Sequence, residues 1–195
     1  MSESLACPLT TVPSHVPLNV SKTIQALGVL FRRDGVRSMN SMRLLKLLYS
    51  ADREALRRTG RPIVGGPVLA MERGPLPEEV YDLIRGRHRQ MPLWDEYLRT
   101  SHFNVQMVKD PDVGQLSRYE IETLQETACR HADDDEWDLS RLTREFPEWK
   151  KNYVSTESRP ISLVDVLEAV GRGADLQDIL EEASEKTFIE GLLGR

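Results

Sequence analysis

The residues that could do chemistry in this sequence include four histidines and an acidic run, and neither set has the spacing of a metal site. No two of His15, His88, His102 and His131 stand three or four residues apart, as two metal ligands on one helix would. The run Asp133-Asp134-Asp135-Glu136 lacks the alternating ligands and the glycine of a calcium loop. We therefore expect a solvated acidic loop and no metal, with a site assembled in space as a minor alternative.

The motifs of several enzyme classes are also missing. The sequence contains no G-x-S-x-G nucleophile elbow, no phosphate-binding G-x-x-x-x-G-K-[ST] loop and no G-x-G-x-x-G fingerprint. Cys7 and Cys129 are the only cysteines, which predicts free thiols rather than a disulfide framework or a cysteine-rich zinc site. We expect a protein that is not an enzyme and that uses no cofactor.

Charge is distributed unevenly along the 195 residues, whose formal net charge is −5. Residues 31–61 carry nine Lys and Arg against three Asp and Glu, whereas residues 110–148 carry four against twelve. The cluster of basic residues at 85–89 could hold phosphate or RNA, but an exposed connection is the simpler interpretation. The asymmetry could steer a charged partner, although charged runs are usually solvated faces.

Residues 21–58 allow a DNA-binding interpretation. Two helices joined across Asp34-Gly35-Val36 could form a helix-turn-helix whose second helix presents Arg43, Lys46, Arg53, Arg57 and Arg58. A recognition helix needs a free polar face, and the leucines at 44, 45, 47 and 48 leave little of this helix unburied. We therefore expect DNA binding to be weak if it occurs.

Hydrophobic periodicity predicts an α+β protein that is mainly α, a compact helical domain with a small antiparallel β-sheet of two or three short strands. Short strands are expected at 67–72 and 103–108, and the second is a candidate to pair with the first. Helices are expected at about 21–33, 38–58, 77–84, 117–129, 141–151, 162–170 and 176–192.

Local signals place some of the boundaries between these elements. Gly74-Pro75 is interpreted as a rigid corner between the first strand and the helix that starts near Pro77. Ser117 with Glu120, and Ser162 with Asp165, have the spacing of helix capping boxes.

The two ends of the chain differ in composition from its middle. Residues 1–19 contain three prolines and little apolar patterning, which predicts a flexible arm before a domain at 20–157. Residues 158–195 predict a helical extension, whose last amphipathic helix offers Ile179, Glu182 and Phe188 as candidate partner contacts. No apolar run reaches the length of a membrane span and no signal peptide is evident, so we expect a cytoplasmic protein.

Three segments, LLKLLYSADREAL, GRPIVGGPVLAMERGPLPEEVYDLI and LSRYEIETLQ, together resemble the Panacea antitoxin domain, also described as the SocA-like phage-associated family. The resemblance covers roughly residues 22–150. The matching positions are Lys46, Leu48, Tyr49, Asp52, Gly60, Pro62, Gly65, Ala70, Gly74, Pro75, Val80, Tyr81, Leu116, Ser117 and Glu120. One departure is Arg144, which stands where the family often has a histidine, while Trp149 is retained.

The resemblance implies a non-enzymatic protein of prokaryotic or phage origin that binds and neutralises a toxin encoded beside it. Two alternatives stay open, namely the helix-turn-helix DNA-binding regulator considered above and an adaptor that delivers a partner to a protease. On this basis Arg53 and Arg57 are further candidate partner contacts. The residues with a structural or partner-binding role in the motif are Lys46, Tyr49, Asp52, Gly66, Gly74, Pro75, Val80, Tyr81 and Trp149. For Lys46, Tyr49, Asp52 and Tyr81, internal packing is the favoured role.

Overall fold

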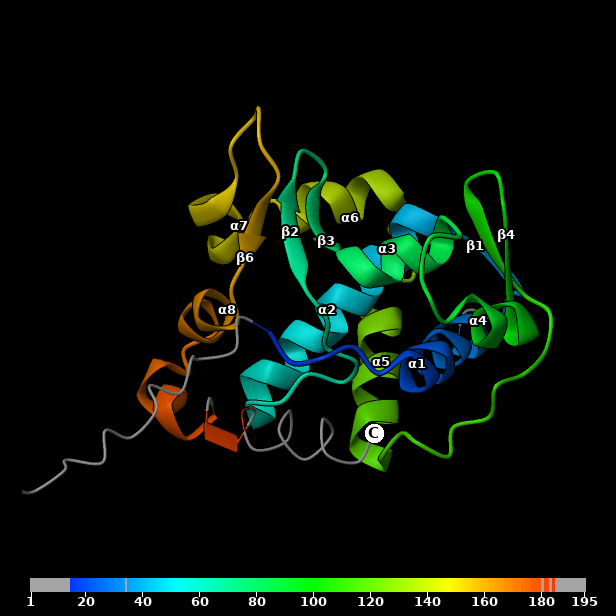
Figure 1. Cartoon of the computed structure of the whole chain (residues 1–195), viewed down its shortest axis with the longest axis horizontal. Helices are drawn as coiled ribbons and strands as arrows, with labels where there is room; N and C mark the ends of the chain where they lie inside the picture. The colour runs from blue at the N-terminus through cyan, green and yellow to red at the C-terminus, as the bar shows by residue number, and fades with distance from the viewer. Residues whose placement is uncertain (1–14, 34, 180, 183, 185–195) are drawn as a thin grey trace, which may run out of the picture.

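The computed structural model of this protein describes residues 15–33, 35–179, 181, 182 and 184 (Figure 1). The helices are α1 (Val20–Arg33), α2 (Ser41–Thr59), α3 (Glu78–Ile84), α4 (Met91–Tyr97), α5 (Arg118–Arg130), α6 (Glu136–Thr143), α7 (Pro147–Asn152) and α8 (Leu163–Ala169), followed by the short 3-10 helix η1 (Gly173–Asp175). The strands are β1 (Ser38–Asn40), β2 (Val68–Met71), β3 (Gly74–Pro77), β4 (Leu98–Ser101), β5 (Asn104–Met107) and β6 (Arg159–Ile161). The predicted α+β class with mainly helical content is confirmed.

The strands form two small antiparallel sheets, in the orders β1-β5-β4 and β3-β2-β6. The pairing suggested between the strands near 68–71 and 104–107 is wrong, because β2 and β5 lie in different sheets. Each instead pairs with the strand next to it in sequence, β2 with β3 and β5 with β4. A short connection keeps two consecutive strands close together, so that they pair as a hairpin.

The hairpin of β2 and β3 corrects the interpretation of Gly74-Pro75 as a corner. Both residues belong to β3, where Met71 is paired with Gly74 and Ala70 with Pro75. A proline is tolerated there because β3 is an edge strand of its sheet. The turn into α3 comes two residues later, and Pro77 is the residue that precedes the first turn of that helix.

The helix α2 occupies the centre of the molecule, with α1, α5, α6, α8 and the hairpin strand β3 all packed against it (Figure 1). Its run of leucines is buried on more than one side, as the sequence predicts, since Leu44, Leu47 and Leu48 each expose at most 1% of their surface. Asn40 caps its start by accepting a hydrogen bond from Met42 N at 2.8 Å. Gly60 ends it in the left-handed conformation, with φ of 74°.

Capping boxes start three other helices. The boxes predicted at Ser117 for α5 and at Ser162 for α8 are both present. A third starts α6 at Asp135, whose Oδ1 accepts hydrogen bonds from Trp137 N and Asp138 N, each at 2.8 Å. The acidic run is therefore not simply a solvated loop, because Asp135 caps a helix that begins at Glu136.

The described ends of the chain pack on the rest of the domain. Near the N-terminus, Gly66 N donates to Val16 O at 2.7 Å, while residues 1–14 of the predicted arm lie outside the described residues. Towards the C-terminus, β6 adds a strand beside β2, and α8 buries Leu163 and Leu167 in a cluster with Trp149. The predicted boundary at residue 157 stays a prediction.

No helix in the described parts of the chain combines the length and the apolar character that crossing a membrane requires.

Candidate functional site

The polar motif residues of α2 lie on neighbouring turns. Lys46, Tyr49 and Arg53 stand at positions i, i+3 and i+7, so that they share one side of the helix. Lys46 bonds to strand β3 of the first hairpin, and Tyr49 and Arg53 both bond to α7. The three residues nevertheless have two different kinds of surroundings.

Tyr49 and Arg53 converge on Glu148 of α7, whose side chain is fully buried. Glu148 Oε1 accepts hydrogen bonds from Tyr49 Oη at 2.9 Å and from Arg53 Nε at 2.7 Å. The Arg53 guanidinium also lies 4.2 Å from the centre of the Phe146 ring. Burial and the adjacent Glu148 carboxylate raise the pKa of Tyr49 well above its usual value. This cluster joins α2 to α7.

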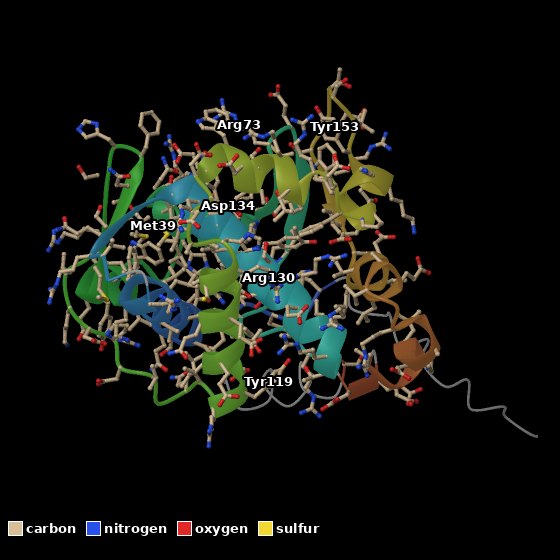
Figure 2. All side chains as sticks on the ribbon, turned by 180° about the vertical axis from the view of Figure 1, so that it is seen from behind. Met39, Arg73, Tyr119, Arg130, Asp134 and Tyr153 are labelled. Carbon is tan, nitrogen blue, oxygen red and sulfur yellow. The ribbon has the colours of Figure 1, made fainter. Side chains whose placement is uncertain are left out.

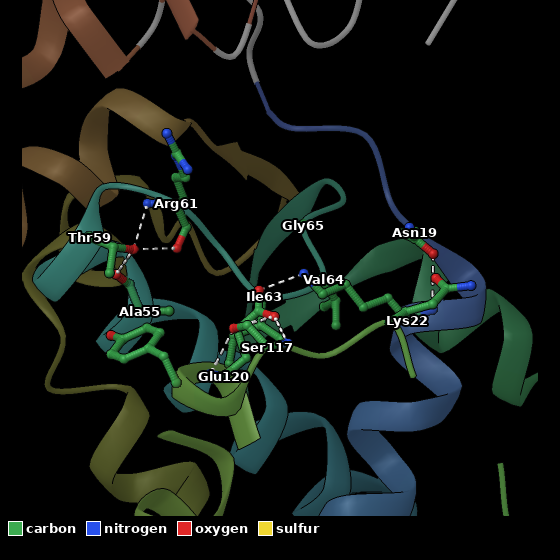
Figure 3. Close-up of polar contacts among 12 residues, drawn as sticks. Asn19, Lys22, Ala55, Thr59, Arg61, Ile63, Val64, Gly65, Ser117 and Glu120 are labelled. Atoms are coloured by element: carbon green, nitrogen blue, oxygen red, sulfur yellow. Dashed lines mark hydrogen bonds and ion pairs between the residues drawn. The ribbon is translucent and has the colours of Figure 1, made fainter. Parts of the chain in front are cut away.

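Asp52 holds the loop that follows α2. Its carboxylate accepts hydrogen bonds from the backbone N–H groups of residues 63, 64 and 65, at 3.0, 3.1 and 3.1 Å. Burial raises the pKa of Asp52 to about 7, against the opposing effect of these three donors. Figure 3 shows the same loop and the contacts that start it, in which Thr59 Oγ1 donates to Ala55 O at 2.9 Å and accepts from Arg61 N at 3.2 Å.

Lys46 has a different environment from these two clusters. Its residue exposes 2% of its surface, and Nζ donates a hydrogen bond to Pro75 O at 2.6 Å. Burial alone lowers the pKa of this amine to about 7. Among the described residues, no carboxylate forms an ion pair with it. The side chain is therefore buried without a compensating charge.

Lys46 lies in the wall of a cavity of about 1020 Å³ between the two hairpins, α3, α4 and α6. Much of the wall is apolar, formed by Met42, Leu45, Met71, Leu76, Tyr81, Leu83, Ile84, Met91, Trp94, Phe103 and Trp137. Two of these side chains are unusually exposed for aromatic residues, Phe103 at 77% and Trp137 at 47%. The Arg73 guanidinium lies 5.0 Å from the Trp137 ring, and Figure 2 shows Arg73 beside the outer side of α6.

The other predicted motif residues have roles that the structure makes clear. Trp149 Nε1 donates to Met71 O at 2.9 Å and its ring stacks on Tyr153 at 4.5 Å, so that it attaches α7 to β2. Val80 is buried in the core, and Tyr81 lies in the cavity wall. Gly66 has φ of 91°, in the region that favours glycine.

Arg144, at the place of the family histidine, lies with its guanidinium 5.6 Å from the Trp149 ring. It can therefore contact the retained tryptophan as a cation over an aromatic face, without the hydrogen-bonding options of an imidazole.

None of the candidate partner contacts that the structure describes belongs to the cavity wall. Arg57 pairs with Glu54 on its own helix at 2.8 Å. Arg61 Nε donates to Glu182 at 3.1 Å, and Ile179 packs beside Gly60, where its Cδ1 would be 2.7 Å from an added Cβ. Phe188 lies outside the described residues. The binding roles of these residues stay predictions.

Sequence reasoning missed Glu148, Phe103 and Trp137. Glu148 lies 95 residues from its partner Arg53 along the chain, so no local pattern could pair them. Phe103 had been interpreted as part of a strand, but it lies between β4 and β5 beside His102, whose φ is 53°. For Phe103, the one available signal in the sequence was its position at the start of a segment in which apolar and polar residues alternate.

Comparison with known protein families gives a match over the range that contains the predicted motif residues of α2, the first hairpin and α7. The sequence profile of the family described as "Antitoxin SocA-like, Panacea domain" matches residues 44–150, which is more than half of the chain. This protein belongs to the SocA-like antitoxin family with a Panacea domain. The match begins at Leu44, later than the start near residue 22 expected from the sequence. No curated protein and no solved structure matched the chain.

In this Panacea domain the matched residues contain most of α2, Glu148, Trp149 and most of the cavity wall. The C-terminal strand β6 and helix α8 follow the matched range, although they pack on it.

Proposed function

We propose that this Panacea-domain protein is the antitoxin of a toxin–antitoxin pair and neutralises its toxin by direct binding, without catalysis. The observation that carries the proposal is the large cavity with Phe103 and Trp137 exposed at its wall. Exposed aromatic side chains beside a concave apolar surface are typical of protein-binding sites, where tryptophan often contributes most to affinity. Almost all of the wall belongs to the range matched by the antitoxin family.

The basic residues of α2 give less support to DNA binding. Arg43 donates to the backbone oxygens of His131 and Asp134 at 3.1 and 3.0 Å, so the domain itself uses this guanidinium. Arg53 is engaged by Glu148, and Lys46 is buried. A recognition helix needs such groups free to reach phosphates and base edges.

Co-expression with the protein encoded by the adjacent reading frame tests the proposal. We expect the wild-type chain to restore growth and to co-purify with that protein. Phe103→Ser and Trp137→Ser together should lower both protection and co-purification, with an unchanged melting temperature, because both side chains are partly or mostly exposed. A neighbouring frame that is not toxic, or a toxin that never associates with the wild-type chain, would contradict the proposal.

Matched controls use exposed apolar residues that lie outside the cavity wall. Val108 directly follows strand β5 and is 39% exposed, and Leu142 lies on the same helix as Trp137 and is 38% exposed. The control variants are Val108→Ser and Leu142→Ser. Both variants should protect as well as the wild type. An assay of toxin activity in vitro, with purified toxin and purified antitoxin and no protease, separates direct binding from delivery to a protease. Only direct binding inhibits the toxin when no protease is present.

A further inference from the structure

We infer that the cavity takes an apolar segment of the toxin that carries a carboxylate, and that Lys46 is the group that binds this carboxylate. The inference rests on the proposed function and adds to it the chemistry of the segment that the cavity recognises.

The Lys46 amine is incompletely bonded in the described structure. An ammonium group has three N–H donors, and the described residues provide Nζ with one acceptor, Pro75 O at 2.6 Å. A buried charge without a counter-ion is costly, which is why the pKa of this amine is lowered to about 7. A ligand carboxylate would supply both the missing charge and the missing acceptors.

The Lys46 amine also lies at the cavity, beside strand β3. Gly74, which lines the cavity together with Lys46, has φ of 96°, and a Cβ placed on it would lie 3.2 Å from Lys46 Nζ and 2.5 Å from Thr143 Oγ1. Glycine at this position therefore lets β3 approach the amine closely without a side chain between them. Because Pro75 is the neighbouring residue, one short strand provides both the acceptor of the amine and part of the cavity wall beside it.

The other charged residues around the cavity do not pair with Lys46 in the described structure. Its wall also contains the acidic residues Glu72, Asp95 and Glu136 and the basic residues Arg73, Arg85 and His102. Glu136 accepts a hydrogen bond from Asn40 Nδ2 at 3.2 Å, and Arg73 lies over Trp137. None of the three carboxylates is within ion-pair distance of Lys46 in the described structure.

These features favour a carboxylate over a phosphate. A phosphate dianion would bring two charges to a single buried ammonium, whereas a carboxylate brings one and leaves no excess. The apolar wall, with three methionines that adapt to different shapes, suits the hydrocarbon part of an acidic peptide segment.

Octanoate is a probe for this chemistry that does not require the toxin. We expect octanoate to raise the pKa of Lys46. This pKa can be measured by NMR of the full chain carrying [ε-¹³C]lysine, and the Lys46 resonance is assigned by its loss in Lys46→Met. Once the pH exceeds the pKa of Lys46 in the protein without octanoate, the affinity for octanoate should fall by roughly tenfold for each further pH unit, since only the ammonium form pairs with the anion. Octanamide should leave the pKa unchanged.

Two variants serve as comparisons in the same titrations. Lys46→Met should bind octanoate at least tenfold more weakly and lose the pH dependence. Lys109→Met changes an exposed lysine outside the cavity and should behave as the wild type. If Lys46→Met fails to fold, the wild-type comparison of octanoate with octanamide decides alone.

An unchanged pKa of Lys46 at saturating octanoate, equal effects of octanamide, or tighter binding of inorganic phosphate would overturn the inference. In the toxin complex, calorimetry at pH 8 in two buffers of different ionisation enthalpy should show the uptake of close to one proton, absent in Lys46→Met. A complex that forms without proton uptake overturns this inference alone. If no complex forms with the wild type, the proposed function fails instead, and the octanoate result still stands.

Discussion

Glu148 and Lys46 are both buried charged residues on the same side of the domain, but their bonding differs. Glu148 accepts hydrogen bonds from Tyr49 and Arg53, so that its charge is compensated by a guanidinium. Lys46 meets a single backbone oxygen and the wall of a large cavity. A buried charge that is fully bonded holds elements together, whereas one that is not remains available to a ligand. This domain thus contains two types of buried charged residue, which sequence alone does not separate.

The largest expected effect comes from removing the carboxylate of the fully bonded cluster. Glu148→Ala leaves Arg53 and Tyr49 without their shared acceptor, and we expect the free energy of unfolding to fall by about 3–5 kcal/mol. Denaturant unfolding measures this loss. Glu145→Ala, which breaks an exposed pair with Lys150, should show no measurable change. Equal stabilities of the two variants would mean that the cluster does not hold α7 to α2.

A smaller loss is expected from changing the glycine beside Lys46. Gly74→Ala places a Cβ at φ of 96° and 2.5 Å from Thr143 Oγ1, and we expect destabilisation by about 2–4 kcal/mol. Gly86→Ala provides the matched control, because Gly86 has φ of 72° with nothing within 4 Å, so it reports strain without a clash. If both variants lose the same stability in thermal unfolding, the close approach at Gly74 contributes nothing.

The parts of this fold that depend on neighbouring residues could be predicted from the sequence. The capping boxes at Ser117 and Ser162 and the buried run of leucines in α2 follow from spacings of a few residues. The hairpin strand at Gly74-Pro75 could not be predicted from composition. It depends on an edge position that only the sheet defines, and both residues are common in turns.

The candidate site was predictable only in part. The motif pointed to Lys46, Tyr49 and Asp52, but their partners Pro75, Glu148 and the loop at 63–65 are joined to them by the tertiary fold. The cavity was not predicted at all, because its wall gathers residues from Asn40 to Trp137. The exposure of Phe103 and Trp137 likewise depends on where the fold places the turn between β4 and β5 and the first turn of α6.

An intermediate effect is expected at Asp52, where the bonds are many but all come from the backbone. Asp52→Asn keeps the size of the side chain but replaces one acceptor oxygen by an NH₂ group, which cannot accept a hydrogen bond from a backbone N–H. We expect a loss of about 1–3 kcal/mol in the free energy of unfolding.

The pH dependence of this variant has a defined sign. Because the folded-state pKa of Asp52 is raised to about 7 above the usual 3.8, its stabilising contribution is complete below pH 3.8 and is lost as the pH rises towards 7. The deficit of Asp52→Asn should therefore be larger at pH 5 than at pH 7, measured by chemical denaturation at both values. A deficit that grows with pH would show that the three donors keep Asp52 ionised.

The smallest expected effect is the one that tests the contrast between the two regions most directly. In the folded protein the Lys46 amine loses its proton near pH 7, whereas in the unfolded chain it keeps the proton to about pH 10.5. The contribution of Lys46 to the free energy of unfolding is therefore lost as the pH falls to 7 and regained as the pH rises. The free energy of unfolding of the wild type should increase by about 1–2 kcal/mol between pH 7 and pH 9 relative to that of Lys46→Met. Lys109→Met should keep the wild-type slope, because Lys109 is paired with Glu96 at the surface. Parallel stability curves for the wild type and Lys46→Met would mean that Lys46 stays charged in the folded state, and that its single bond to Pro75 satisfies it as fully as Arg53 satisfies Glu148.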